Sequence, residues 1–306
     1  MGERTAIEWC DSTVNPTPCC TGCELYPDHC YAARLHKVYD GHNPGWPKSF
    51  TEPTYFEGRI KAAARWSDLR GKKRLGKPWL DGMPRLIFVD DMGDPFAPFD
   101  DPAWSPELHL LHPLLDRIEH SPHIWLLLTK WPDRFAEFAK HAGGLPRNLW
   151  GATTVTSQET TWRIGHLLTI DLAVRFLSIE PLLGPVDLSK CTLPSGASAH
   201  PLKVQPGHYP LSGSVGPIHW IAVGGESGPG ARVCNIENIR LVLRQCRESN
   251  VRAFVKQLGS RPFGKVTSFS GNPCDLRKDR WIFHPKGGDP AEWPEDLRIR
   301  EFLKAN

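Results

Sequence analysis

The middle of the chain alternates short apolar runs with amphipathic segments, joined by polar or glycine-containing loops. The apolar runs are nearly continuous and rich in Val, Ile and Trp, which is typical of parallel strands buried on both faces. They predict strands at Leu86–Asp90, Ile124–Thr129, Leu149–Thr154, Val174–Ile179, Ile218–Val223 and Arg252–Lys256. The amphipathic segments predict helices at Pro106–His120, Asp133–His141, Gln158–Leu168 and Asn235–Ser249.

Strands that alternate with helices indicate βαβ units with right-handed crossovers. A further strand near Ala6–Trp9 brings the number of strands to about seven. We therefore expect an α/β fold, namely a partial or full (β/α) barrel of about six to seven parallel strands. An open doubly wound sheet is the alternative.

Three stretches depart from this rhythm. Residues 41–84 are rich in Pro, Gly and Trp and predict an excursion with one helix around Tyr55–Trp66. Residues 184–217 lack periodicity and predict a long loop. Residues 258–306 predict a C-terminal extension packed on the barrel, which leaves residues 1–257 as the barrel-like domain.

Composition limits the class of protein. The 306 residues are 40% hydrophobic and 23% charged, and the net charge of +3 is too small by itself to indicate nucleic-acid binding. No apolar run reaches the length of about eighteen residues that a membrane span needs, and no signal-peptide core is present. We therefore expect a cytoplasmic protein without a membrane partner. The basic run Arg70–Lys77 is interpreted as a solvated loop, with contact to a nucleotide or nucleic acid as the alternative.

Polar residues follow each strand of the predicted series, at the strand ends where parallel α/β folds bind ligands. This convergence predicts a polar pocket formed by Asp90, Asp91, Asp94, Thr129, Lys130, Thr153, Thr154, Thr156, Ser178, Glu180, Gly224, Gly225, Glu226, Ser227, Lys256 and Gln257. The segment GGESGPG matches neither the Walker pattern nor GxGxxG. Because Glu226 would repel phosphate, this segment better suits an amino group or a pair of ribose hydroxyls.

Five of the nine cysteines lie within the first thirty residues, and the last of the five opens a predicted helix, CYAARLHKVY. They are Cys10, Cys19, Cys20, Cys23 and Cys30. In a reducing compartment such clustering indicates a metal site rather than disulfides. Four thiolates, or three with a histidine such as His29, would hold zinc, whereas three would hold a [4Fe–4S] cluster with one open iron. Spacing alone slightly favours zinc, because the usual CxxxCxxC pattern of the cluster class is absent.

Seven characteristic segments follow one another along nearly the whole chain. They are NPTPCC with CYA at Asn15–Ala32, LIFVDDMGDPF at Leu86–Phe96, LLTKWPDRF at Leu127–Phe135, VRFLSIEPLLGPVDL at Val174–Leu188, IHWIAVGGESGPGAR at Ile218–Arg232, FVKQLG at Phe254–Gly259 and KGGDPAEWPEDLRIREF at Lys286–Phe302. In these segments the chain resembles a phage-associated family with a three-Cys motif. That family is a domain of unknown function and is regarded as similar to radical S-adenosylmethionine enzymes.

The resemblance implies that Cys20, Cys23 and Cys30 are the metal ligands, with Cys19 in reserve. The chain departs from the family pattern at the middle cysteine, because Cys23 lies next to Cys20 rather than next to Cys30. The remaining cysteines are assigned to packing; these are Cys10, Cys191, Cys234, Cys246 and Cys274.

The resemblance further implies a radical S-adenosylmethionine-like enzyme with a [4Fe–4S] cluster. Such an enzyme takes an electron from a donor protein and cleaves S-adenosylmethionine to a 5′-deoxyadenosyl radical. Its substrate is not identified by the sequence, although a nucleotide or nucleic acid is a candidate. Contacts to S-adenosylmethionine are expected from Asp90, Asp91, Asp94, Lys130, Glu180, Gly224, Gly225, Glu226 and Lys256.

Two other classes of protein remain open. A zinc-stapled α/β module that binds nucleic acid or protein needs four metal ligands and leaves the strand-end carboxylates without a role. A metal-dependent hydrolase or nuclease would bind divalent ions among Asp90, Asp91, Asp94, Glu180 and Glu226. This interpretation leaves the cysteine cluster with a structural role only.

Overall fold

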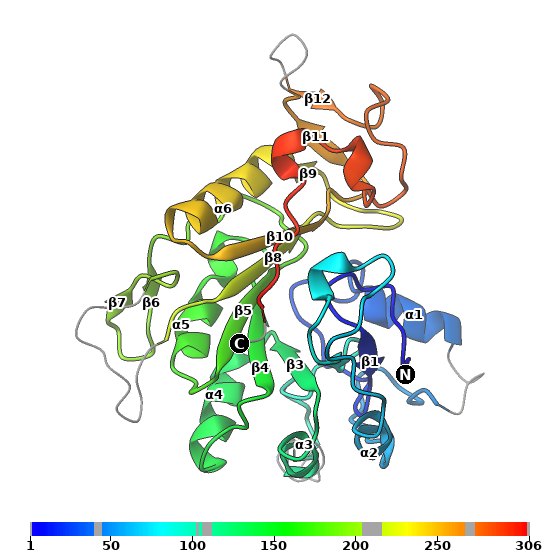
Figure 1. Cartoon of the computed structure of the whole chain (residues 1–306), viewed down its shortest axis with the longest axis vertical. Helices are drawn as coiled ribbons and strands as arrows, with labels where there is room; N and C mark the ends of the chain where they lie inside the picture. The colour runs from blue at the N-terminus through cyan, green and yellow to red at the C-terminus, as the bar shows by residue number, and fades with distance from the viewer. Residues whose placement is uncertain are drawn as a thin grey trace. The chain divides into compact units, whose positions relative to one another are not determined.

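Seven strands run parallel in one sheet, in the order β1-β2-β3-β4-β5-β8-β10 (Figure 1). They are β1 (Ser12–Val14), β2 (Leu86–Val89), β3 (Ile124–Thr129), β4 (Leu149–Thr154), β5 (Val174–Ile179), β8 (Trp220–Gly224) and β10 (Arg252–Gln257). Nearly all residues of the inner strands are buried, as expected from their continuous apolar runs. The α/β class and a partial (β/α) barrel are thereby confirmed.

The computed structural model describes residues 2–39, 45–101, 104–105, 112–203, 216–266 and 273–304. The chain divides into two units. The first unit comprises Met1–Ala152, Ile170–Val174 and Ala305–Asn306, and the second comprises Thr153–Thr169 and Arg175–Lys304.

The first unit contains β1, β2, β3 and the start of β4 with short helices between them. These helices are α1 (Tyr31–Tyr39), α2 (Arg59–Ala63), the 3-10 turn η1 (Pro78–Leu80), α3 (His112–Ile118) and α4 (Pro132–His141). Helix α4 shows how the sequence fixes its start. Pro132 lies in the first turn, where backbone N–H groups have no partner within the helix, so the lack of an N–H on proline costs no hydrogen bond. The negative charge of Asp133 interacts favourably with the positive end of the helix dipole. The helix then buries Phe135 and Phe138.

The second unit contains β5, β8 and β10 with two small additional sheets. Its other elements are η3 (Gln158–Thr160), α5 (Trp162–Leu168), β6 (Cys191–Thr192), β7 (Ser198–Ala199), β9 (Cys234–Asn235), α6 (Ile236–Glu248), β11 (Pro262–Gly264), β12 (Cys274–Asp275), η4 (Pro290–Glu292) and η5 (Glu295–Leu297). Helix α6 is capped by Asn235, whose side chain accepts a hydrogen bond from the N–H of Glu237. Its buried residues Ile236, Ile239 and Leu243 recur at helical spacing.

Most predicted elements are confirmed. The strands Ile124–Thr129, Leu149–Thr154 and Val174–Ile179 match residue for residue. The helices predicted after Cys30 and at 133–141, 158–168 and 235–249 are present, the third opening as a 3-10 turn. Only five residues of the predicted Tyr55–Trp66 helix are helical. Of the helix predicted at 106–120, residues 112–118 are helical and 106–111 lie outside the described residues.

The strand predicted at Ala6–Trp9 is wrong, although the count of seven strands is right. The first strand is β1, which pairs with β2 through Ser12 and Ile87. Residues 5–10 instead turn around the Lys77 ammonium, which donates to the carbonyls of Thr5, Ile7 and Cys10 at 2.8, 2.8 and 2.7 Å. In an extended strand the carbonyls of residues 5 and 7 would point to one side and that of residue 10 to the other, so their convergence on one ammonium requires a turn.

The interpretation of Arg70–Lys77 as a solvated basic loop is right for Arg70, Lys72 and Lys73, which are exposed, but two other cations of the run are structural. Besides Lys77, the Arg74 guanidinium binds the Asp11 carboxylate at 3.2 Å and donates to four backbone carbonyls. Lys72 and Lys73 are exposed. The run therefore fastens the N-terminal segment of the first unit.

The two predicted irregular stretches of the second unit contain short strands. Strands β6 and β7 form an antiparallel pair within the stretch predicted as a long loop. Beyond residue 257, β11 joins β12 and β9, and Arg300 forms a bridge with Phe254 of β10. The predicted domain limit at residue 257 stays a prediction. Among the described residues, no helix combines the length and apolarity required to span a membrane.

Candidate cysteine site at the end of β1

The cysteine loop leaves the carboxyl end of β1 and runs without regular structure to α1. The two prolines of NPTPCC restrict its backbone and offer no N–H groups. Backbone hydrogen bonds hold the loop to neighbouring segments of the same chain. The N–H of Cys20 donates to the Phe50 carbonyl at 2.8 Å, and the N–H of Asp94 donates to the Cys19 carbonyl at 3.0 Å. Gly93 makes this approach possible, since a Cβ there would lie 2.3 Å from the Thr17 oxygen and 2.6 Å from the Cys19 oxygen.

The carboxylates that follow β2 bind the cysteine loop directly. Asp90 accepts from the backbone N–H of Thr17 at 2.8 Å and from its hydroxyl. Asp91 accepts from the Asn15 side-chain amide at 2.7 Å, and the Asn15 oxygen accepts from a backbone N–H of the same turn. Both Asp90 oxygens are thus occupied, and its side chain is 2% exposed. The described contacts make Asp90 and Asp91 supports of the loop; their predicted role in binding S-adenosylmethionine stays a prediction.

Asp94 connects this loop to the end of β3. Its carboxylate accepts from the Thr129 hydroxyl at 2.8 Å, from the Lys130 N–H at 2.8 Å and from the Phe96 N–H at 3.1 Å. These bonds fix the backbone from which the Lys130 side chain extends. Asp94 therefore positions Lys130 beside the cysteine loop.

Each of the three predicted ligand sulfurs receives a backbone N–H. The N–H of Gly22 donates to Cys20 at 3.4 Å, that of Ala33 donates to Cys30 at 3.5 Å, and that of Leu25 bonds to Cys23. Cys20 and Cys30 also share one apolar cluster with Phe50 and Met92. Such N–H···S bonds are a recurring feature of iron–sulfur sites, where they tune the sulfur ligands.

Cys19, the reserve ligand, has a different environment. Its sulfur accepts from the N–H of Thr54 at 3.3 Å, and its thiol donates to the Thr54 carbonyl at 3.9 Å. Burial raises the pKa of Cys19 to about 12. Cys19 thus contacts the chain around Thr54, and this favours Cys20 over Cys19 as the ligand.

Lys130 is the cation of the site. Burial alone would lower its pKa, but the nearby Cys23, Asp94 and Cys20 raise it more, so the ammonium stays charged. Burial raises the pKa of Cys20 and of Cys23, while Lys130 opposes both shifts. The Lys130 ammonium therefore interacts electrostatically with Cys20 and Cys23, and its positive charge would stabilise these two side chains as thiolates.

The cysteines do not converge on one point. Within the part of the chain that the structure describes, no three His, Cys, Asp or Glu side chains form a group that could hold a single metal ion. The Thr21 hydroxyl, between Cys20 and Cys23, is buried and finds no hydrogen-bond partner among the described residues. The loop is therefore rich in sulfur donors and holds one unsatisfied polar group, but it is not shaped around a single ion.

Buried carboxyls make the stability of this region depend on pH. Burial raises the pKa of Asp90 to about 7 and that of Asp94 to about 6. A carboxyl whose pKa rises on folding holds its proton more tightly in the folded state, so stability falls as pH increases from about 4 to about 7. We expect the protein to unfold at lower urea concentration at about pH 8 than at about pH 5, and Asp90→Asn to reduce this difference.

Asparagine suits this test, because Asp90 has a φ of 55°, a conformation that asparagine also adopts. The control is Asp116→Asn on α3, where the carboxylate is exposed and should leave the pH difference at its wild-type size. If the stability of Asp90→Asn differs between pH 5 and pH 8 as much as that of the wild type, the raised pKa of Asp90 is not the cause of the pH dependence.

Of the predicted site residues in the second unit, Glu226 has a partner that the sequence did not indicate. Its carboxylate accepts from the Arg232 guanidinium at 2.8 and 3.1 Å and from the Arg232 N–H at 2.8 Å. Glu226 is nearly buried, whereas Arg232 is one-third exposed. The pair closes the GGESGPG turn on itself, and the predicted binding role of Glu226 stays a prediction.

Gly224 and Gly225 serve a close backbone contact. The N–H of Gly225 donates to the Gln257 carbonyl at 3.0 Å, and the Gln257 amide returns a bond to the Gly225 carbonyl at 2.9 Å. A Cβ on Gly225 would lie 2.4 Å from the Leu258 oxygen. These glycines therefore let the ends of β8 and β10 meet, which agrees with the weak case for a phosphate-binding loop.

The remaining predicted polar residues of the second unit lie at the ends of its strands. Glu180 and Lys256 form a half-buried ion pair of 3.3 Å. Thr153, Thr154, Thr156 and Ser178 are buried. Their assignment to a cofactor stays a prediction.

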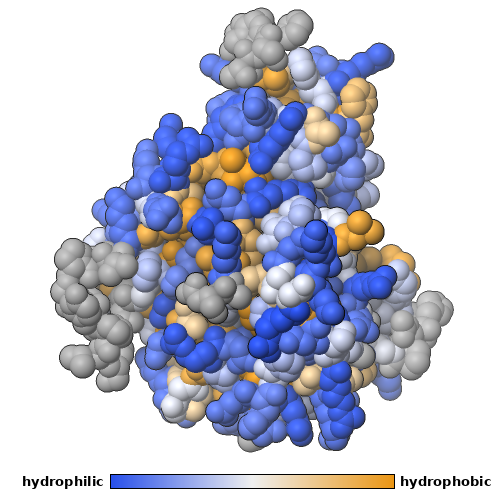
Figure 2. All heavy atoms as spheres, in the orientation of Figure 1, coloured by the Kyte–Doolittle hydropathy of each residue, from blue (hydrophilic) through white to orange (hydrophobic). Residues whose placement is uncertain are grey.

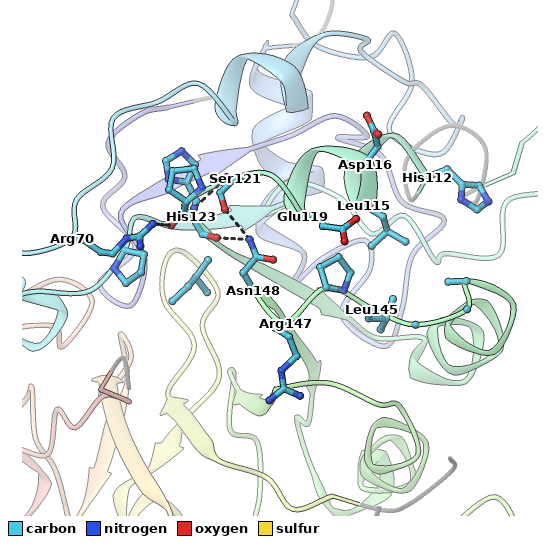
Figure 3. Close-up of a pocket in the computed structure, with 17 residues that line it drawn as sticks. Arg70, His112, Leu115, Asp116, Glu119, Ser121, His123, Leu145, Arg147 and Asn148 are labelled. Carbon is cyan, nitrogen blue, oxygen red and sulfur yellow. Dashed lines mark hydrogen bonds between the residues drawn. The ribbon is translucent and has the colours of Figure 1, made fainter. Parts of the chain in front are cut away.

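A separate cavity of about 910 Å³ lies at the other end of the first unit's strands (Figure 3). Pro84, Ile124 and Asn148, at the amino ends of β2, β3 and β4, line it together with Arg70 and His123. The Asn148 amide donates to three backbone carbonyls here. No predicted site residue lines the cavity, and parallel α/β folds bind ligands at the opposite strand ends.

The partners that hold the site were not predicted from the sequence. Asn15, Thr17 and Thr54 bind the carboxylates and Cys19 but were not proposed as site residues. A signal for two of them was present, because in Asn15-Pro-Thr17-Pro the prolines restrict the backbone and leave two polar side chains free to make contacts. For Thr54 the sequence held no such signal.

No curated protein and no solved structure matches the chain significantly. The family described as "Protein of unknown function (DUF5131)" matches residues 4–275, which include the cysteine loop and all seven strands of the main sheet. The chain therefore belongs to the DUF5131 family.

Proposed function

We propose that this protein is a radical S-adenosylmethionine-like iron–sulfur enzyme whose cluster is bound by Cys20, Cys23 and Cys30. The observation that carries the proposal is the loop at the end of β1, where each of these three sulfurs accepts a backbone N–H. A charged Lys130 lies beside them. Three thiolates leave one iron of a four-iron cluster open.

The arrangement of the sulfurs favours a cluster over zinc. A tetrahedral zinc ion requires four ligands that point at one position. The ligands of a four-iron cluster bind different irons, so their sulfurs lie farther apart and need not share a point. The absence of a single-ion group among the described residues therefore counts against zinc more than against a cluster.

The chain's own groups would orient the cofactor. When bound, the cluster would supply the electron that cleaves S-adenosylmethionine to a 5′-deoxyadenosyl radical. Lys130 would bind the methionine carboxylate, and the Thr21 hydroxyl would gain a partner in the filled site. Asp94 would hold Lys130 in place through the bond from its backbone N–H. An electron-donor protein would provide the electron that reduces the cluster. The association of the family with phages stays a prediction.

The hydrolase alternative has less support. A divalent-ion site needs carboxylate oxygens that are available to a metal. Asp90 and Asp94 instead accept hydrogen bonds from neighbouring residues, and Glu226 pairs with Arg232. These contacts favour the cysteine loop as the reactive centre.

The test is anaerobic reconstitution with iron and sulfide, followed by metal analysis and electron paramagnetic resonance of the dithionite-reduced protein. We expect about four irons per chain and a reduced-cluster signal that changes when S-adenosylmethionine is added. The variants Cys20→Ser, Cys23→Ser and Cys30→Ser should each lose most of the iron and the signal.

Cys19→Ser is the matched control. It lies next to Cys20, and serine can accept the same bond from Thr54, so this variant should keep the cluster. Circular dichroism verifies that every variant is folded. Stoichiometric zinc without cluster uptake would overturn the proposal and favour the zinc-stapled module.

A further inference from the structure

Positive charge is concentrated in one stretch of the second unit. Residues 261–286 contain six Lys and Arg and two Asp and Glu, a net charge of +4, whereas the whole chain carries +3. The rest of the chain is therefore slightly acidic. The six cations are Arg261, Lys265, Arg277, Lys278, Arg280 and Lys286.

One carbonyl joins the chain segments that carry three of these cations, Arg261, Arg277 and Lys286. The Pro285 oxygen accepts from the Ser260 hydroxyl at 2.8 Å and from the Arg277 guanidinium at 2.9 Å. Arg261 follows Ser260 and Lys286 follows Pro285, so backbone segments about 25 residues apart in the sequence meet here, while the Arg261 guanidinium donates to the Ala231 carbonyl at 3.5 Å. Strands β11 and β12 complete the contact, since Phe263 pairs with Asp275.

Two carboxylates of this region, Asp275 and Glu292, accept hydrogen bonds from backbone N–H groups. Asp275 accepts from the backbone N–H groups of Arg277 and Lys278, and Glu292 accepts from those of Phe283 and His284. In the described part of the chain, none of the six cations forms an ion pair. Arg261 and Arg277 each use one guanidinium nitrogen for a backbone carbonyl, but no carboxylate among the described residues compensates the charge of the six cations.

Two phenyl rings are exposed among these charges. Phe263 on β11 is 38% exposed and Phe283 is 66% exposed. Hydrophobic residues lie among hydrophilic ones over the region of β11 and β12 (Figure 2). Exposed aromatic rings interleaved with cations are the recurring design of surfaces that bind single-stranded nucleic acid, where rings stack on bases and cations contact phosphates.

We propose that the surface formed by Arg261, Phe263, Arg277, Lys278, Phe283 and Lys286 binds single-stranded nucleic acid. The proposal is independent of the iron–sulfur chemistry, because none of these residues lies in the cysteine loop. It also differs in place from the alternative interpretation of Arg70–Lys77 as a nucleic-acid contact. The run Arg70–Lys77, the earlier candidate, uses Arg74 and Lys77 to hold backbone carbonyls.

The test is fluorescence anisotropy of a labelled oligothymidylate of about 20 nucleotides with the full-length protein, over a range of salt concentrations. We expect binding that weakens with salt. Lys278→Gln combined with Lys286→Gln should lower affinity and reduce the salt slope by about 1.4, which is about 0.7 for each lost phosphate contact. Phe283→Ala should weaken binding roughly 5- to 150-fold with little change in that slope.

The matched control is Lys72→Gln combined with Lys73→Gln, which removes the same charge from an exposed part of the first unit and should leave affinity unchanged. The proposal is overturned if the oligonucleotide does not bind at low salt, or if this control weakens binding as much as the Lys278 and Lys286 variant. Equal binding of duplex DNA with no effect of Phe283→Ala would also overturn it. The assay requires neither cluster nor S-adenosylmethionine, so failure here leaves the proposed function standing.

Discussion

Replacing Arg74 with alanine is expected to lower the free energy of unfolding by about 3–5 kcal/mol, the cost of leaving a buried charge without its partner. The Arg74 and Asp11 side chains are 7% and 6% exposed, so water cannot replace the lost guanidinium. The substitution also removes donors from the carbonyls of Met83 and Pro84. Unfolding by urea, followed by circular dichroism, measures the effect.

Arg70→Ala is the control from the same basic run. The Arg70 side chain is 58% exposed and pairs with Asp68 at the surface, where ion pairs contribute at most about 1 kcal/mol. A loss for Arg74→Ala no larger than that for Arg70→Ala would refute the structural role that we assign to the run.

Gly93→Ala is expected to displace the cysteine loop. The new Cβ would lie 2.3, 2.6 and 2.7 Å from backbone atoms of Thr17 and Cys19, which cannot rotate away as a side chain can. Overpacking of this kind typically costs about 1–3 kcal/mol, and we expect the upper part of that range because backbone must move. Since the loop carries Cys20 and Cys23, the variant should also take up less iron on reconstitution.

Gly184→Ala provides the comparison. A Cβ at Gly184 meets nothing within 4 Å, so this variant should change stability by no more than about 0.5 kcal/mol and leave iron uptake unchanged. Wild-type stability and iron content in Gly93→Ala would show that the loop tolerates movement and that its packing against Gly93 is not needed.

The central strands could be predicted from the sequence because burial on both faces leaves a continuous apolar signal. IWLLLT and VRFLSI are examples, and both strands were located residue for residue. Strand β1 has no such signal. Its residues Ser12 and Thr13 are polar, and Ser12 is buried through hydrogen bonds to Glu3 and Arg85. Arg85 lies 73 residues away in the sequence, and such a partner cannot be predicted from local periodicity.

The residue types of the candidate site could be predicted from the sequence, but the contacts between those residues could not. The cysteines and the strand-end carboxylates were identified from residue type and position. Their interactions depend on which segments meet in space, as when Thr17 meets Asp90 and Thr129 meets Asp94. Similarly, charge counting identified Arg70–Lys77 as a basic run but could not show that Arg74 is buried beside Asp11.

The contacts that hold the cysteine loop do not involve a metal. Asp90 with Thr17, Asp91 with Asn15, and the Asp94 N–H with the Cys19 carbonyl are bonds between protein groups alone. A classical zinc finger, by contrast, unfolds without its metal. If the proposed cluster is bound, the chain without it would keep these bonds, so iron delivery would complete a folded protein and no refolding of the loop would be needed.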